Sequence, residues 1–225
     1  MSRVLSVNLA RPMPNPAKTT TVTGIDKVPT DEAVAVRAPG PMRGGVGSGL
    51  ADDVIGNQRL HGGDDQAVYA YAREDLDRWQ TTLDRPLANG NFGENLTTSG
   101  IDVTGAVVGE RWRVGTDGLL LEVTSPRTPC RTFASFLGIR GWMGTFTRAA
   151  VPGAYLRVIH PGTVRAGDAI EVIDRPDSDI TVGLVFRAIS GDAELLPRLL
   201  DVDALPEDIR KRARKRIPVA EPPAR

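Results

Sequence analysis

The chain has 225 residues, 40% of them hydrophobic, and its 28 basic and 28 acidic side chains give a formal net charge of zero at neutral pH. This balance is typical of one globular domain, or of one domain with an appendage, that buries a full core. It argues against a protein that binds a nucleic-acid polymer through phosphate neutralisation. The chain has no long apolar stretch, and Met1–Asn8 lacks the apolar core of a signal peptide. With a single cysteine, we therefore expect a cytoplasmic protein with no membrane partner.

Short apolar runs rich in Val, Ile and Leu, separated by many of the 24 glycines and 17 prolines, predict a mainly β fold. The expected strands, in chain order, are Arg3–Leu9, Val34–Val36, Val107–Val114, Leu119–Thr124, Gly153–Ile159 and Ala169–Ile173. The turn Gly115–Gly118 predicts a hairpin between two of these strands, because its Asp-Gly step tolerates positive φ.

One helix is expected in the body of the chain, over Arg73–Leu83. Its apolar residues Leu76, Trp79 and Leu83 follow one another at spacings of three and four, with charged residues between them. The glycine-rich segment Pro39–Gly49 predicts a flexible loop, and it lacks the Lys-Ser/Thr pair of a phosphate-binding loop.

The pattern changes after Asp174, where three short helices are expected. Asp179 or Thr181 is placed to cap a helix that runs through Ile189, Asp192 to cap a helix over Ala193–Leu200, and Pro206 to begin a helix that ends near Arg216. We therefore divide the chain into residues 1–175 and a helical appendage with its tail, residues 176–225. The last helix is strongly basic, which indicates either a solvated face or a contact with an anionic partner.

The only cysteine, Cys130, lies between two arginines, Arg127 and Arg131, at the exit of an expected strand. Guanidinium groups favour the thiolate form, whereas a cysteine that only fills space prefers apolar neighbours. The local sequence leaves both roles open. With two histidines in the chain, a structural zinc site is not expected, and no dinucleotide fingerprint or serine nucleophile motif is present.

Two further segments offer binding groups. In His61-Gly62-Gly63-Asp64 the glycines would let backbone N–H groups approach an anion, although a tight turn with a surface histidine explains the same residues. In the loop Gly90–Thr97, which leads into a short extended piece, Asn95 offers donors and an acceptor that suit a heterocycle edge, although turn formation is the commoner role of such an asparagine.

Taken together, these segments resemble the ordered motifs of the MOSC-domain family, and most closely its YiiM-like branch. The resemblance spans about residues 3–175 and is specific because several motifs recur in order. It is carried by His61–Asp64, the helix with Tyr71, Arg73, Glu74 and Trp79, Phe92–Leu96, Val108–Gly115 and Ser125–Cys130.

The resemblance implies a mainly β, barrel-like fold with peripheral helices and a C-terminal three-helix domain. It also implies that the molybdenum cofactor, a pyranopterin dithiolene that carries a phosphate, is bound with Cys130 as the metal ligand and catalytic residue. The cofactor-binding residues that it implies are His61, Gly62, Gly63, Asp64, Asn95, Arg127, Thr128 and Arg131.

For activity, the resemblance implies an oxidoreductase that reduces N-hydroxylated compounds, such as hydroxylaminopurines, to amines. The sequence has no flavin, haem or iron–sulfur motif, so such an enzyme needs an electron-donating reductase as a partner. Two other classes stay open: a carrier of the cofactor or of sulfur, with a persulfide on Cys130, and a non-catalytic interaction module.

Overall fold

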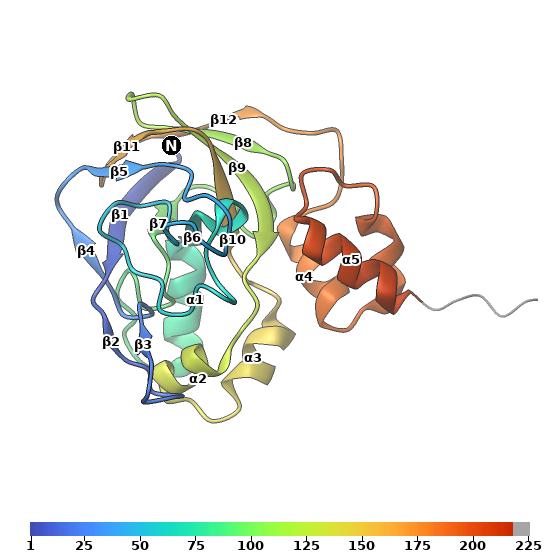
Figure 1. Cartoon of the computed structure of the whole chain (residues 1–225), viewed down its shortest axis with the longest axis horizontal. Coiled ribbons are helices and arrows are strands. Elements are labelled where there is room, and N and C mark those ends of the chain that lie inside the picture. Colours follow the sequence, from blue (N-terminus) through green and yellow to red (C-terminus); the bar gives the residue numbers. More distant parts are fainter. Residues whose placement is uncertain (218–225) are drawn as a thin grey trace, which may run out of the picture.

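A large, curled, mixed β-sheet forms the body of the molecule (Figure 1). The computed structural model describes residues 1–217, so the expected tail from residue 218 to 225 lies outside the described residues. The strands of the sheet, in spatial order, are β12 (Ile170–Asp174), β8 (Arg111–Val114), β9 (Leu119–Pro126), β10 (Ala154–His160), β6 (Val68–Ala72), β7 (Leu96–Ser99), β1 (Arg3–Ala10) and β4 (Lys27–Thr30). Two small pairs accompany it: β5 (Val34–Val36) with β11 (Gly162–Val164), and β2 (Met13–Pro14) with β3 (Val22–Thr23).

The curl of the sheet brings its distant strands together. The N–H of Val4 donates to the carbonyl of Asp168 (2.9 Å), and the N–H of Ile170 donates to the carbonyl of Ser2 (2.9 Å). The chain just before β12 therefore meets the start of β1, but among residues 1–217 the strands do not close into a barrel. The prediction of a mainly β fold is confirmed, and the expected barrel is corrected to an open sheet, in which β4 pairs with the second half of β1 and only an isolated bridge joins Arg3 to Ala169.

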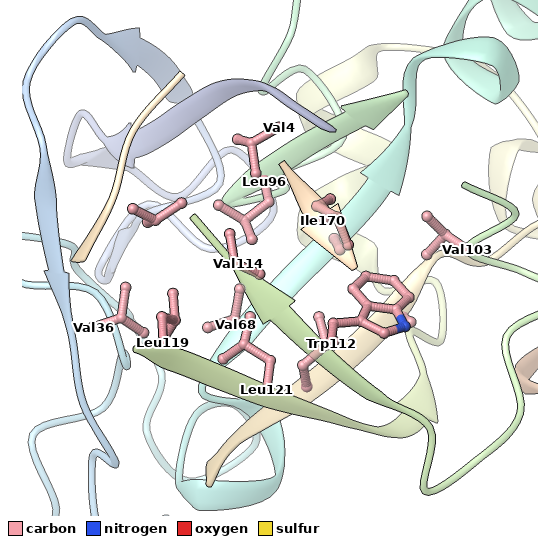
Figure 2. Close-up of a cluster of buried hydrophobic side chains, with 14 of the residues drawn as sticks. Val4, Val36, Val68, Leu96, Val103, Trp112, Val114, Leu119, Leu121 and Ile170 are labelled. Carbon is pink, nitrogen blue, oxygen red and sulfur yellow. The ribbon is translucent and has the colours of Figure 1, made fainter. Parts of the chain in front are cut away.

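The strand β6 is buried on both of its faces. Val68 and Ala70 point into the apolar core between the curled halves of the sheet, whereas Tyr69 and Tyr71 belong to an aromatic core. Figure 2 shows the first of these cores, in which β8 and β9 contribute Trp112, Val114, Leu119 and Leu121. Burying an aliphatic side chain of this size contributes about 1.5–3 kcal/mol, so this core is the main source of stability for the sheet.

The aromatic core lies between the sheet and three helices: α1 (Arg73–Leu83), α2 (Arg131–Leu137) and α3 (Trp142–Ala149). Trp79 of α1 and Trp142 of α3 have ring centroids 4.8 Å apart, and Phe133 of α2 packs edge-on against Trp142 at 5.5 Å. The prediction of α1 is confirmed with the same bounds. The helices α2 and α3, seven and eight residues long, are too short to show an apolar period and were not expected.

The C-terminal helices are α4 (Val182–Ser190), the 3₁₀ helix η2 (Ala193–Leu199) and α5 (Glu207–Arg216), and they lie beside β9 (Figure 1). They have an apolar core of their own, but α4 also inserts Val182 into the core of the sheet and Phe186 into the aromatic core. The boundary after residue 175 stays a prediction.

Two expectations about these elements need correction, and one open alternative is resolved. The strand expected over Val107–Val114 begins only at Arg111, because Gly109 adopts φ +93° and turns the chain. The segment after Asp192 is a 3₁₀ helix containing Pro197, and the Asp192 side chain makes no capping bond. Of the two alternative caps of α4, Thr181 is the one that accepts a hydrogen bond, from the N–H of Leu184 (3.2 Å). The predicted hairpin is confirmed, with Val114 opposite Leu119.

Candidate functional site

A cavity of about 260 Å³ separates the edge of the β body from α5. One wall is formed by the segment from Leu60 to Gln66 with Ser125, Pro126, Thr128 and Tyr155, and Pro41 and Met42 lie at its side. The opposite wall is formed by Ile189, Pro206, Asp208, Ile209 and Arg212. Five of the residues predicted from sequence, His61, Gly62, Gly63, Asp64 and Thr128, therefore lie around one space.

The two glycines of the His61–Asp64 turn are required by a close approach to the loop over residues 39–49. Both adopt positive φ, and a Cβ on Gly63 would lie 2.7 Å from the backbone nitrogen of Met42. Their N–H groups are already used: Gly63 donates to the carbonyl of Gly47 (3.1 Å) and Gly62 to the side chain of Gln66 (3.2 Å). The glycine N–H groups that the sequence suggested for an anion therefore already have partners within the protein, although the turn lines the cavity.

Arg127 lies in the interior, directly after β9, with 5% of its surface exposed. Its guanidinium carbon lies 3.9 Å from the ring centroid of Phe133 and 5.3 Å from that of Tyr69. It forms no ion pair within residues 1–217, and its buried Nη1 has no hydrogen-bond partner there. A buried charge without a counter-ion is costly, so an anionic group beside this guanidinium would stabilise it.

Cys130 immediately precedes α2 and is half-buried against the aromatic core. It is close enough to Arg127 and Tyr155 for a negative charge on its sulfur to act on both side chains. Pro126 and Pro129 fix the backbone on the way from β9, so the sulfur is held in a defined place. It does not line the cavity itself, although Thr128, two residues before it, does.

Two groups on the cavity wall have altered acidity. Burial, with the charge of Arg127 as a second cause, lowers the pKa of His61, so its imidazole is neutral at pH 7. Burial raises the pKa of Tyr155, although Arg127 opposes this, so its hydroxyl stays protonated. Both side chains are therefore uncharged at neutral pH.

Asn95 lies apart from the cavity, in a polar cluster under β1. Its Nδ2 donates to Asp53 (2.9 Å), and its Oδ1 accepts from the N–H of Tyr69 (3.2 Å). Asp53 also pairs with the buried ammonium of Lys27 (2.6 Å). The predicted cofactor role of Asn95 is not tested by this arrangement, but its polar atoms are occupied inside the protein. Arg131 is exposed at the start of α2 and does not line the cavity.

Several residues of this site were not expected from the sequence. Tyr155 and Arg212 lie on elements that were expected, but their direction toward the cavity depends on how these elements meet. The pairing of Lys27 with Asp53 joins segments 26 residues apart and has no sequence signal. Within residues 1–217 no helix is long and apolar enough to cross a membrane, and no group of three or more His, Cys, Asp or Glu side chains is placed to hold a metal ion.

Comparison with known proteins identifies relatives across most of the chain. A family model described as MOSC domain matches residues 57–171, a range that includes the turn at His61 and Cys130. YflK of Bacillus subtilis, described as uncharacterized, is 33% identical over 211 residues, which cover 92% of this chain and 90% of that protein. YiiM of Escherichia coli is 31% identical over 137 residues, 60% of each chain. A protein named reductase from Gibberella moniliformis is 29% identical over 162 residues, but these are only 29% of its length.

Solved structures show the same fold. YiiM from Geobacillus stearothermophilus superimposes with a TM-score of 0.76 at 23% identity, covering 97% of this chain and all of that one. YiiM from Escherichia coli gives a TM-score of 0.72, also at 23% identity, covering 96% and 92%. At these identities the likeness concerns the fold alone.

Proposed function

The chain belongs to the MOSC domain family, and from this premise we propose that it binds the molybdenum cofactor beside Cys130 and reduces N-hydroxylated compounds to amines. A family member named reductase supports an enzymatic or cofactor-related activity, although this name describes a much longer protein. Beyond this general activity, we propose the molybdenum cofactor as the bound group and the reduction of N-hydroxylated compounds as the reaction.

The observation that carries the proposal is the buried guanidinium of Arg127, whose Nη1 has no hydrogen-bond partner within residues 1–217, next to Cys130. Arg127 has aromatic rings on two sides and no carboxylate partner within residues 1–217. An anionic ligand at this place would remove the cost of the isolated charge. A thiolate on Cys130 and an anionic cofactor both meet this requirement.

Cys130, as a single protein ligand, fits a metal ion whose other ligands come mostly from a cofactor. No group of three or more protein ligands exists within residues 1–217, so a metal held by side chains alone has no support there. The soft sulfur of Cys130 is a suitable single protein ligand for a molybdenum ion that a dithiolene already holds. His61 and Thr128 would contact the organic part of the cofactor from the cavity wall.

When bound, the cofactor would supply the two-electron chemistry. Reduction of an N–OH group to an amine consumes two electrons and two protons, breaks the N–O bond and releases water. Tyr155, whose raised pKa keeps its hydroxyl protonated at neutral pH, would donate a hydrogen bond to the oxygen that leaves. The electrons come from a separate reductase, because the single cysteine cannot hold an iron–sulfur cluster.

The proposal is tested by metal analysis of protein produced in a host that makes the cofactor. We expect wild-type protein to contain molybdenum and to reduce a hydroxylaminopurine with an artificial electron donor, and the Cys130→Ser variant to lose both. Arg127→Leu should lower the molybdenum content, whereas Arg140→Ala, at an exposed arginine without a hydrogen bond or ion pair among residues 1–217, should not. Thermal melting of each variant shows whether it is folded.

Two outcomes would speak against the proposal. Wild-type protein without molybdenum, or a folded Cys130→Ser variant that keeps the metal and the turnover, contradicts a ligand role for this cysteine. A persulfide on Cys130, seen by mass spectrometry in protein without molybdenum, would support a sulfur carrier instead.

A further inference from the structure

The wall of the cavity formed by α5 carries charged side chains that the proposed reaction does not use. Asp208 and Arg212 both line the cavity and are exposed. They are four residues apart, a spacing at which a carboxylate and a guanidinium often pair on a helix. Here no ion pair joins them, and no hydrogen bond engages either side chain within the described part of the chain, although Glu207 on the same helix pairs with Arg210 and Lys211.

The other ionisable side chains at the cavity either have a partner within the protein or are uncharged. Asp65 pairs with Arg157 (2.7 Å), and Asp64 accepts the N–H of Gly40 (2.8 Å). His61 is neutral because burial and Arg127 lower its pKa. Among the described residues, the guanidinium of Arg212 is therefore the cationic group of the cavity wall that is free to meet a ligand, with the carboxylate of Asp208 one turn away.

We propose that Arg212 binds an anionic group of the substrate, a phosphate or a carboxylate remote from the N–OH group, while Asp208 accepts a hydrogen bond from the same molecule. The inference rests on the proposed function and narrows its substrate class to anionic N-hydroxylated compounds, for example a hydroxylaminopurine nucleotide in preference to the free base. The opposite charges one turn apart also set the orientation, because a substrate bound in reverse would place its anion against Asp208.

Position in the chain supports a selective role. The family model ends at residue 171, before α4 and α5, whereas Cys130 and the turn at His61 lie inside it. The groups proposed to hold the cofactor and the groups proposed to select the substrate therefore come from different parts of the chain. A change in α5 can alter selectivity without touching Cys130.

The test compares a phosphorylated and an unphosphorylated probe. Calorimetry of the full chain should show adenosine 5′-monophosphate binding about tenfold more tightly than adenosine, because a charge-assisted hydrogen bond to phosphate contributes about 1.5 kcal/mol. In Arg212→Ala this preference should disappear, in Arg212→Lys it should partly return, and in Arg214→Ala it should stay. Arg214 is the matched control, since it is an exposed arginine of α5 that does not line the cavity.

The second arm measures turnover and metal content. The loaded enzyme should reduce hydroxylaminopurine nucleotide with a lower KM than the free base, and Arg212→Ala should raise only the KM for the nucleotide. Equal binding of both probes to wild type, or a preference that survives in Arg212→Ala, would overturn the inference while leaving the proposed function intact. A fall in molybdenum content in Arg212→Ala would also overturn it, by assigning Arg212 to the phosphate of the cofactor. If wild type contains no molybdenum and reduces neither compound, the proposed function fails and the calorimetric arm still decides the role of Arg212.

Discussion

Asp53 joins several segments through one buried carboxylate. It accepts hydrogen bonds from Lys27 (2.6 Å), Ser48 (2.6 Å), Asn95 (2.9 Å) and the N–H of Ala10 (2.9 Å). Burial works to raise the pKa of Asp53, but Lys27 and the hydrogen bonds outweigh it and lower that pKa. For Lys27, burial has the larger effect and lowers the pKa of the ammonium. The attraction between Lys27 and Asp53 therefore offsets the cost of burying each charge, and it is lost when either residue is replaced.

Replacement of Asp53 by Asn leaves the ammonium of Lys27 buried without a counter-ion. We expect Asp53→Asn to lower the free energy of unfolding by about 3 kcal/mol at pH 7, measured by urea denaturation. The control is Asp26→Asn, which breaks the exposed pair of Asp26 with Arg11 and should cost less than about 1 kcal/mol. Equal losses in the two variants would contradict the structural role of Asp53.

His61 gives the molecule a pH dependence whose sign follows from its environment. Its pKa in the folded state is lowered below the ordinary value of 6.5, so the unfolded chain binds the proton more readily. The contribution of His61 to stability is therefore fully present above pH 6.5 and is lost as the pH falls through the folded-state pKa. We expect the stability of His61→Gln to fall less than that of wild type between pH 7 and pH 5. An NMR titration in which the His61 imidazole has a pKa at or above 6.5 would contradict this account.

At the scale of elements, the start of α4 combines a helix cap that the sequence indicates with contacts to the β body that depend on the tertiary structure. The hydroxyl oxygen of Thr181 accepts the N–H of Leu184, and the backbone of Thr181 forms an isolated bridge with Val107. Immediately after the cap, Val182 enters the core of the sheet. The cap therefore fixes the place where the helical segment joins the β body.

Loss of this cap should be measurable. We expect Thr181→Ala to lower the free energy of unfolding by about 1 kcal/mol, since one N–H of the first turn loses its partner. Thr181→Ser keeps the hydroxyl and should be close to wild type in the same denaturation experiment. A Ser variant as unstable as the Ala variant would show that the methyl group, and not the cap, stabilises this junction.

Elements with a strong local pattern were predicted, and those without one were missed. The spacing of apolar residues predicts the helix α1, and the Asp-Gly turn predicts the hairpin of β8 and β9. Each of these signals lies within a short segment of the sequence. The strand β6 lacks alternation because all of its residues are buried, between two different cores. Whether this segment forms a strand therefore depends on packing partners that are distant in sequence.

At the scale of the whole molecule, the C-terminal helices share their packing with the β body. Phe186 of α4 packs edge-on against Phe146 of α3, with ring centroids 6.1 Å apart. Arg157 of β10 donates to the carbonyl of Ala204 (2.9 Å), just before α5. Removing these helices would expose apolar side chains of both large cores and one wall of the cavity.

A chain truncated after Asp174 tests this dependence. We expect the truncated protein to be poorly soluble or to melt well below the full chain, and the full chain to unfold in a single transition by circular dichroism and by tryptophan fluorescence. A truncated chain that stays soluble and melts at the same temperature as the full chain would show that the β body folds alone.

The sequence by itself determined the fold class, the bounds of α1, the hairpin, and the residues that carry the family resemblance, because each of these depends on neighbours within a few positions. It also named Cys130, Arg127 and the His61–Asp64 turn. Only the tertiary structure decided that Nη1 of the buried Arg127 has no hydrogen-bond partner among residues 1–217, that Asn95 is occupied by Asp53, and that Arg212 of α5 lines the same cavity as His61. These are properties of contacts between segments up to 151 residues apart, from His61 to Arg212, and burial and charge pairing at such distances have no local signal.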